Sequence, residues 1–432
     1  MAKTISAGEL ERRLTDPGFV LIDVRPMAAF NGWRMQGESR GGHIPGAIPY
    51  PLQWTERMDP VEFKGYLESK GITAAKEIAI YGYAIDDGLA MLGKMEQLNY
   101  ENCLLCEEGI IGWVADAERP VEHLPNYQKL IHADWLHALI ATWSANPSRG
   151  KSFELFHVGD DVLEGYDVGH IPTAVYLDTR SLESAPQWNR ISDQELQQRL
   201  PELGITHDKT IVLYGREIQP GPEQPSSSQH AGQTAAARAA VILMYAGVED
   251  VRLLDGGLTA WTSAGFELET STNNAAPADR FGRRVPAHPN YMVDIETVKA
   301  MLADPSGSVV SARSWSEFIG EKSGYHYLES KGRIAGAVWG AGMTDGYHVH
   351  PLRNLDNSMR SYRQIQESWL AEGITPGKHI AFYCGSGWRA SDYFFCAHLM
   401  GWEQIALYDG GWLEWSQDES NSVERGPPPK VL

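Results

Sequence analysis

Short apolar runs alternate along the chain with longer segments that carry apolar residues at helical spacing. The run 380–383 is apolar throughout and predicts a buried strand. In the segment after it, Ala390, Phe394 and Ala397 recur on one face of a predicted helix, which Gly401 ends. Strands that alternate with helices are typical of a parallel sheet covered by helices on both faces. The pattern therefore predicts an α/β fold.

The same set of elements occurs three times. Each copy starts with a motif related to Gly-His-Ile-Pro-Gly-Ala, at 42–47, 169–174 and 332–337. Each continues with an apolar run that ends in tyrosine, at 78–81, 211–214 and 380–383. Each closes with a turn, Asp-Gly-Gly in the last two copies, and a tryptophan, at Trp113, Trp261 and Trp415. Repeats of about 130 to 160 residues are far longer than those of a solenoid, so each copy predicts a domain.

Three tandem domains follow from this repeat. We place them at 1–125, 126–275 and 276–432, since the stretch 273–278 has the composition of a linker. A segment rich in Pro, Ser and Gln at 219–232 predicts a surface insertion in the second domain.

One loop carries the candidate chemistry. It has the sequence Cys-Gly-Ser-Gly-Trp-Arg at 384–389 and lies between the predicted strand and helix, where open α/β sheets bind their ligands. A helix N-terminus and amides that the glycines can turn inward favour a thiolate, and the guanidinium of Arg389 adds positive charge. We therefore expect Cys384 to be a nucleophile in a cup of main-chain amides. The alternative is an inert cysteine at the end of a core strand.

The first two copies have no cysteine at this place. Gly82 and Gly215 stand where the third copy has Cys384. Since glycine has no nucleophilic side chain, we expect the first and second domains to be inactive. They are then structural, or they shape the entrance to the third domain.

The repeated elements and the cysteine loop resemble the rhodanese superfamily, and within it the bacterial three-domain sulfurtransferases. The resemblance covers almost the whole chain apart from the insertion. It implies three rhodanese-like domains, each a parallel sheet flanked by helices on both faces, of which only the third is catalytic. It also implies that Cys384 cycles through a persulfide without a metal or an organic cofactor. The sulfur would be held by the loop amides, at Gly385, Ser386, Gly387, Trp388 and Arg389.

The resemblance also implies the substrates. The donor would be thiosulfate or 3-mercaptopyruvate, and the acceptor cyanide, a thiol or an acceptor protein. In the mercaptopyruvate enzymes the arginine that matches Arg313 binds the substrate carboxylate. A structural role for Arg313 is the alternative, because Arg25 has the same place in the first domain. Ser386 either donates its hydroxyl to the substrate or fits the turn, and Trp388 either lines the pocket or anchors a domain interface.

The composition of the chain argues against some classes of binding partner. The 432 residues are 43% hydrophobic and 22% charged, with a formal net charge of −19. This charge argues against nucleic acid, whose phosphates would be repelled, and no apolar stretch reaches the ~18 residues of a membrane span. The first residues lack the apolar segment of a signal peptide, which predicts a cytoplasmic protein, or a periplasmic one if an export signal was removed. We expect a monomer.

Two other functions compete with sulfur transfer by an enzyme. Cysteine phosphatases and arsenate reductases also place a thiolate in an amide cup before an arginine. Their loops are longer, whereas only the four residues 385–388 separate Cys384 from Arg389 here. A protein-interaction module that relays sulfur from Cys384 to a partner would explain two domains without a nucleophile.

The other cysteines and the repeated histidines predict structural roles. Cys103 and Cys106 form a C-x-x-C, but they lie in an apolar run and are expected in the core. Cys396 lies in the helix after the loop, too far along it for a disulfide to the nucleophile. His43 and His170 recur in domains without a nucleophile, so we expect them to hydrogen-bond a loop. No metal site is predicted.

Overall fold

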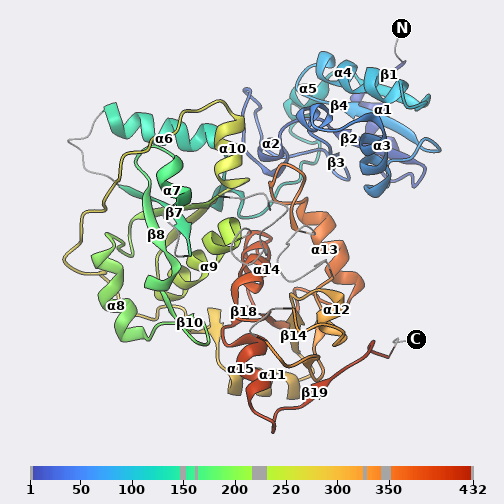
Figure 1. Ribbon diagram of the computed structural model, residues 1–432. Helices are drawn as coiled ribbons and strands as arrows, with labels where there is room; N and C mark the ends of the chain where they lie inside the picture. The colour runs from blue at the N-terminus through green and yellow to red at the C-terminus, as the bar shows by residue number, and fades with distance from the viewer. Residues whose placement is uncertain are drawn as a thin grey trace. The chain divides into compact units, whose positions relative to one another are not determined.

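The chain folds into two compact units, Met1–Tyr127 and Gln128–Leu432. The first unit holds the first repeat, and the second unit holds the other two (Figure 1). Most of the predicted insertion falls outside the described residues, so it stays a prediction. The computed structural model describes residues 3–145, 152–160, 164–216, 231–324, 328–341 and 352–429.

Each repeat forms a five-stranded sheet with the same strand order. The orders are β1-β5-β4-β2-β3, β6-β12-β11-β7-β8 and β13-β18-β17-β14-β16. Neighbouring strands in each sheet pair in parallel. In all three sheets the middle strand (β4, β11 or β17) carries the repeated tyrosine, as the last residue of β4 and β17 and as the last but one of β11. The predicted α/β class is confirmed.

The first repeat forms the sheet and helices of the first unit. Its strands are β1 (Lys3–Ile5), β2 (Phe19–Asp23), β3 (Ile48–Pro49), β4 (Glu77–Tyr81) and β5 (Cys103–Cys106). Its helices are α1 (Ala7–Arg13), α2 (Met27–Asn31), α3 (Pro60–Ser69), α4 (Ile85–Glu96) and α5 (Gly109–Ala115). Strands β2 and β4 are buried almost throughout, as expected of a parallel sheet between two layers of helices.

The second repeat adds a short antiparallel pair, β9 and β10, to the common sheet. Its strands are β6 (Leu130–Ile131), β7 (Phe153–Gly159), β8 (Val175–Asp178), β9 (Glu183–Ser184), β10 (Asn189–Arg190), β11 (Thr210–Gly215) and β12 (Asp250–Leu254). Its helices are α6 (Ala133–Ala145), α7 (Glu164–Val168), α8 (Asp193–Glu202), α9 (Ala231–Ala246) and α10 (Gly257–Ser263).

The third repeat follows the same plan and carries the cysteine loop. Its strands are β13 (Met292–Val293), β14 (Gly307–Ser311), β15 (Arg333–Ile334), β16 (Val338–Trp339), β17 (His379–Tyr383), β18 (Ile405–Tyr408) and β19 (Val423–Glu424). Its helices are α11 (Ile295–Ala303), α12 (Trp315–Phe318), α13 (Tyr362–Ala371), α14 (Trp388–Leu399) and α15 (Gly411–Gln417).

Helices α9 and α14 pack against each other and join the second and third domains (Figure 1). Nearly every residue of α14 is buried, including the polar Ser391 and Asp392. The sequence predicts one apolar face for this helix, and Tyr393 packs on Phe382 of its own sheet. The opposite face is buried as well, because α9 of the second domain covers it.

The repeated motifs make the same contacts in all three domains. The repeated tyrosine of the middle strand accepts a hydrogen bond from the isoleucine amide of the first motif, in the pairs Ile44–Tyr81 (3.2 Å), Ile171–Tyr214 (3.0 Å) and Ile334–Tyr383 (3.4 Å). The indole of the closing tryptophan donates to a nearby carbonyl, in the pairs Trp113–Pro120 (2.9 Å), Trp261–Glu267 (2.9 Å) and Trp415–Ser422 (3.1 Å). The motifs therefore hold the loops of each domain together.

The histidines of the first motif hold a loop, as predicted. Nδ1 of His43 bonds to the carbonyl of Phe30 at 2.8 Å, and Nδ1 of His170 bonds to the carbonyl of Tyr166 at 2.9 Å. Each imidazole also stacks on the ring of that same residue, with 3.6 Å between ring centroids.

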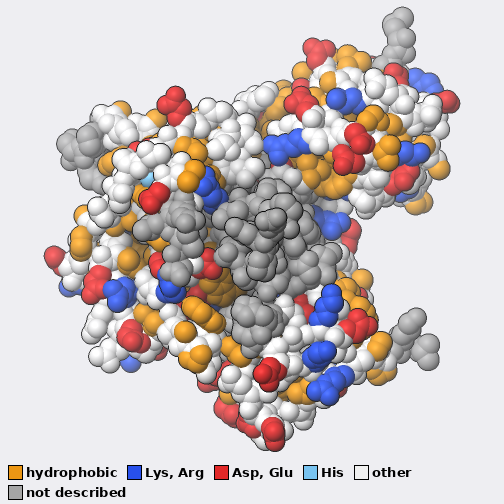
Figure 2. Space-filling view, viewed as in Figure 1, with side chains coloured by type: hydrophobic (Ala, Val, Ile, Leu, Met, Phe, Trp, Pro, Cys, Tyr) orange, Lys and Arg blue, Asp and Glu red, His pale blue; other side chains and the backbone are white. Residues whose placement is uncertain are grey.

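Charged side chains of both signs lie on the surface. On the face drawn in Figure 2, acidic and basic side chains are interspersed on both units. Among the described residues, no helix combines the length and the apolar character that crossing a membrane would require.

Candidate active site

Cys384 lies directly after the middle strand β17 and is fully buried. Three residues separate it from the first turn of α14. The last of them, Gly387, precedes α14 with φ 82°, a left-handed conformation that glycine adopts without steric cost. The sulfur therefore lies at the N-terminus of a twelve-residue helix, where free amides and the helix dipole favour negative charge.

The closing turn holds the carbonyl side of the loop. The amide of Trp412 donates to the carbonyl of Cys384 at 2.7 Å, and that of Leu413 donates to Gly385 at 2.9 Å. Gly411 permits this approach, since a Cβ there would lie 2.7 Å from the Gly385 oxygen, and its φ is 56°. Because the C=O and N–H of a trans peptide point in opposite directions, the amides of Gly385 and Ser386 point away from α15. An anion-binding loop requires this orientation.

A buried cluster of charges supports the loop from the other side. Nη1 and Nη2 of Arg389 donate to Oε2 and Oε1 of Glu317, both at 2.9 Å. Glu317 also accepts from the amide of Ser314 at 3.0 Å, in the capping box that begins α12. Burial alone would raise the pKa of Glu317, but Arg389 and Arg313 outweigh it and lower this pKa to about 2. The carboxylate is therefore charged wherever the protein functions.

Arg313 is engaged within the protein. Its Nε donates to Glu317 at 3.2 Å, its Nη1 to the carbonyl of Gly332 at 2.8 Å and its Nη2 to that of Ser323 at 2.8 Å. The side chain is fully buried. These contacts favour the structural alternative for Arg313. Its binding of a substrate carboxylate stays a prediction.

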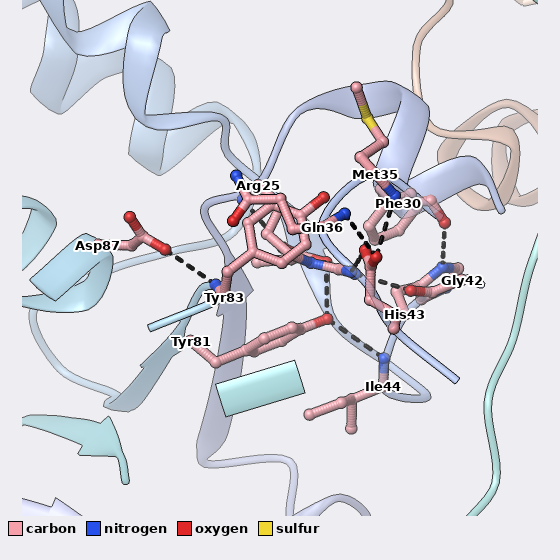
Figure 3. Close-up of polar contacts among 12 residues, drawn as sticks. Arg25, Phe30, Met35, Gln36, Gly42, His43, Ile44, Tyr81, Tyr83 and Asp87 are labelled. Atoms are coloured by element: carbon pink, nitrogen blue, oxygen red, sulfur yellow. Dashed lines mark hydrogen bonds and ion pairs between the residues drawn. The ribbon is translucent and has the colours of Figure 1, made fainter. Parts of the chain in front are cut away.

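The first domain builds the same arginine site without a nucleophile (Figure 3). Nη2 of Arg25 donates to the carbonyl of Gly42 at 2.7 Å, as Arg313 does to Gly332. Its other partners are the carboxylate of Asp23, at 2.7 Å, and that of Glu38, at 3.8 Å. An arginine at this position thus holds the first motif in a domain that has Gly82 in place of the cysteine too.

The loop of the first domain is closed by its own carboxylate. Oδ2 of Asp87 accepts hydrogen bonds from the amides of Tyr83, at 2.9 Å, and Ala84, at 3.1 Å (Figure 3 draws the first). These amides correspond to those of Gly385 and Ser386. A bound anion would have to displace Asp87, so this domain lacks both the thiol and an open cup.

Gly215 of the second domain leaves no room for a nucleophile. A Cβ at this position would overlap the main chain of Gly232 at the start of α9. After Arg216, the loop lies outside the described residues up to the start of α9. No cysteine fits at Gly215 without a change in the main chain.

Trp388 links the loop to the second domain. Its indole Nε1 donates to Oε2 of Glu183 at 3.1 Å. This contact supports the interface role, and lining of the pocket by Trp388 stays a prediction. The spacing of motifs in the sequence could not indicate Glu183, because it lies in another domain.

Ser386 is buried in the loop, with 6% of its surface exposed. Its donation of a hydrogen bond to a substrate stays a prediction.

The remaining cysteines are buried free thiols. Burial raises the pKa of Cys103 to about 11 and those of Cys106 and Cys396 to about 12. Cys103 and Cys106 are buried in the core, as predicted, and all three thiols are protonated at neutral pH. Among the described residues, no three His, Cys, Asp or Glu side chains are grouped as metal ligands.

Comparison with known families settles the affiliation of the chain. It matches the family described as "Rhodanese-like domain" at three places, residues 6–116, 160–264 and 294–418. The chain belongs to the rhodanese family. The prediction of three rhodanese-like domains is confirmed, while the boundaries given above stay predictions.

Relatives of this rhodanese are sulfurtransferases. It is 36% identical over 410 residues to thiosulfate sulfurtransferase YnjE of Escherichia coli (strain K12), covering 94% of this chain and 89% of YnjE. The solved structure of the anaerobic ergothioneine biosynthesis enzyme from Chlorobium limicola, in complex with trimethyl histidine, is similar with a TM-score of 0.94 and 38% identity, covering 99% and 100% of the two chains. A structure of EanB with a cysteine persulfide and ergothioneine is equally similar, with a TM-score of 0.94, 38% identity and the same coverage. The predicted likeness to three-domain sulfurtransferases is confirmed.

Proposed function

We propose that this rhodanese moves sulfane sulfur from a small-molecule donor to a thiophilic acceptor through a persulfide on Cys384. The observation that carries the proposal is the contrast between two equivalent loops. In the third domain a thiol stands before the N-terminus of α14, and loop carbonyls bond to α15. In the first domain the equivalent amides are occupied by Asp87. Of these two loops, the third domain's therefore suits an anionic sulfur.

The first step loads the cysteine. The Cys384 thiolate attacks the outer sulfur of the donor, a new S–S bond forms, and the bond between that sulfur and the rest of the donor breaks. With thiosulfate the leaving group is sulfite, which takes the electron pair. With 3-mercaptopyruvate the C–S bond breaks and pyruvate leaves after taking up a proton. The loop amides stabilise the charge on the bound sulfur.

The second step unloads it. A thiolate or cyanide attacks the terminal sulfur of the persulfide, forms a bond to it and returns the electron pair of the S–S bond to Cys384. The thiolate that results is stabilised by the same amides that held the sulfur. Arg389 acts through its paired contact with Glu317, which fixes the first turn of α14.

Intact-mass measurement tests the loading step. After incubation with thiosulfate, the protein should gain one sulfur, about 32 Da, and cyanide should remove it. The Cys384→Ser variant should gain nothing, while Cys396→Ser, which changes a buried thiol on the next helix, should load as the wild type does. A sulfur that persists in Cys384→Ser would end the proposal.

A second experiment asks whether Arg313 binds the carboxylate of the donor. It compares the loading of Cys384 by thiosulfate and by 3-mercaptopyruvate, in the wild type and in Arg313→Ala. Arg313 donates to Glu317, Gly332 and Ser323, so we expect similar loss with both donors. A loss specific to mercaptopyruvate would instead assign the donor's carboxylate to this arginine.

A trimethylated histidine is a second candidate acceptor. It is favoured by the likeness, over the whole chain, to solved structures that contain trimethyl histidine or ergothioneine. In this reaction a carbon of the imidazole would take the terminal sulfur and lose its proton, while the thiol of Cys384 is restored.

The two acceptor classes are distinguished on the loaded protein. Persulfidated protein is mixed with trimethyl histidine or with a simple thiol, and the loss of about 32 Da from the protein is followed over time. Unloading by the histidine, with a product heavier by one sulfur, would support the second candidate. Unloading by the thiol alone would exclude it.

A further inference from the structure

Two buried charged residues occupy matching positions on the paired helices α9 and α14. Arg238 and Asp392 each lie nine residues before the glycine that follows the helix. Their exposed fractions are 0% and 1%. Each forms an ion pair within its own domain, Arg238 with Glu183 and Asp392 with Arg353. The two domains thus contain the same buried pair with the charges exchanged.

The pair in the second domain reaches into the third. Nε of Arg238 donates to Oε2 of Glu183 at 2.9 Å. Nη2 of Arg238 donates across the interface to Oδ1 of Asp409 at 2.7 Å. Asp409 belongs to the closing turn that holds the Cys384 loop, and it also accepts from the amide of Arg190 at 2.9 Å.

Both members of this pair also contact the loop itself. The carboxylate oxygen of Glu183 that receives Arg238 also receives the indole N–H of Trp388 at 3.1 Å. Nη1 of Arg238 lies against Gly387, since a Cβ there would be 2.9 Å from it. Within the described residues this nitrogen has no hydrogen-bond acceptor. A buried cation and its carboxylate therefore touch two residues of the loop, Gly387 just before α14 and Trp388, the first residue of α14.

We propose that the Arg238–Glu183 pair of the second domain positions the Cys384 loop for persulfide formation. The inference rests on the proposed function, because it concerns the same loop. Neither side chain is placed at the sulfur; they act through Gly387 and Trp388, whose amides belong to the cup. A domain without a nucleophile would thus complete the site of another domain.

The other half of the interface provides a matched control. Asp255 is the counterpart of Asp409 in the closing turn of the second domain, and it accepts from the amide of Met359 at 2.6 Å. The loop that this turn holds has Gly215 in place of a cysteine. Asp255→Asn therefore disturbs the same interface by the same kind of change without touching the Cys384 loop.

Protonation of Glu183 should make the effect of the Arg238–Glu183 pair depend on pH. Burial raises its pKa to about 7, against the opposing effect of Arg238 and of the Trp388 hydrogen bond, and Asp409 adds to the rise. These are the groups that face Glu183 from α9, from α14 and from the turn before α15. Above about pH 7 the carboxylate is charged and pairs with Arg238, and below it the pair loses one charge. Loop positioning should therefore weaken as the pH falls through this range.

The test measures the rate of Cys384 persulfide formation with thiosulfate in wild type, Glu183→Gln and Asp255→Asn between pH 6 and 9. We expect Glu183→Gln to lower the maximum rate by about ten- to a hundredfold at pH 8. The half-saturating thiosulfate concentration should stay within about twofold, because the donor's own contacts remain. In Glu183→Gln the rate of persulfide formation should lose the part of its pH dependence near pH 7 that arises from Glu183. Asp255→Asn should keep the pH profile of the wild type.

Arg238→Lys is a second variant that retains the charge but not the fork of donors. It should lower the maximum rate as well, with thiosulfate affinity retained. Equal effects of Glu183→Gln and Asp255→Asn, or unchanged rates in both Glu183→Gln and Arg238→Lys, would overturn the positioning role. Failure of the proposed function looks different, since the wild type itself would then form no persulfide.

Discussion

Asp87 and Arg389 occupy the same position, five residues after Gly82 and Cys384 respectively. Arg389 turns away from the loop to Glu317, whereas Asp87 turns into it and accepts from two of its amides. A carboxylate in an amide cup satisfies the donors and repels a second anion. The first domain therefore lacks more than a cysteine.

We predict that a cysteine alone does not activate the first domain. Gly82→Cys in the Cys384→Ser background should gain no sulfur from thiosulfate by intact mass. The new side chain would also crowd Asp87, which should cost about 1 to 3 kcal/mol of unfolding free energy. Adding Asp87→Gly opens the cup and should permit slow loading. Loading of Gly82→Cys without that second change would show that Asp87 does not block the loop.

Glu317 is the anion shared by two buried arginines. Removing one member of such a cluster leaves buried charge without compensation, at a cost of about 3 to 5 kcal/mol. We expect Glu317→Gln to lose stability of this size at pH 7, measured by urea unfolding. The pKa of Glu317 is about 2 when folded, against 4.5 as the ordinary value. A lowered pKa stabilises the fold above the ordinary value, and this contribution disappears as the pH falls toward 2.

The pH dependence separates this effect from loss of packing. The stability difference between wild type and Glu317→Gln should be constant from pH 7 to about 5 and shrink by about 3 kcal/mol between pH 5 and 2. Glu195→Gln, an exposed capping-box residue in the second domain, serves as the matched charge change. A difference that does not change with pH would contradict the charged role of Glu317.

At the scale of elements, the loop is held between the N-termini of two helices. Its carbonyls receive amides of α15, its own amides point away from that helix, and α14 begins directly after Gly387. The close approach to α15 depends on Gly411, and the same glycine in the other domains, Gly109 and Gly257, lies under the carbonyls of Gly82 and Gly215. The closing motif thus supports this loop in every repeat, with or without a cysteine.

Gly411→Ala tests this support, and Gly373→Ala is its control. Both glycines have a left-handed main chain, but only Gly411 lies against another part of the protein. Gly411 has φ 56° and would bring a Cβ to 2.7 Å from the Gly385 oxygen, whereas Gly373 has φ 75° and open space. Both alanine variants should lose about 1 to 2 kcal/mol from the left-handed conformation. Only Gly411→Ala should also slow persulfide formation, by about tenfold or more. Equal rates in both variants would mean that the loop does not depend on this approach.

Much of the fold was predictable because it follows local rules. Apolar runs and turn residues located the sheets, and the position of Cys384 after the run 380–383 located the candidate site. The closure by Asp87 was not predictable, because it depends on the direction of a side chain. Nor was the contact between Arg238 and Asp409, which are 171 residues apart and carry no common spacing. Burial on both faces of α14 arises from another domain, so the periodicity of that helix alone could not reveal it.

At the scale of the whole molecule, the candidate site lies in the second of the two units. The hydrogen bonds described above for the Cys384 loop come from residues of the unit Gln128–Leu432. Within it, α14 is buried on its own sheet and on α9. The domain with Cys384 therefore needs the second domain to cover this helix, while the first unit has its own sheet and core.

We therefore predict that residues 128–432 fold and load sulfur without the first unit. Their rate of persulfide formation should lie within about twofold of that of the full chain, and full-length unfolding should show two transitions, because separate cores unfold separately. Residues 276–432 alone should not fold stably, since Phe395 and Leu399 of α14, which are 2% and 1% exposed, belong to a helix that would lose its cover. Circular dichroism and intact mass on the two fragments provide the measurements. A folded 128–432 fragment that fails to load would assign a direct role to the first unit. A folded, active 276–432 fragment would show that the third domain does not need α9 to cover α14.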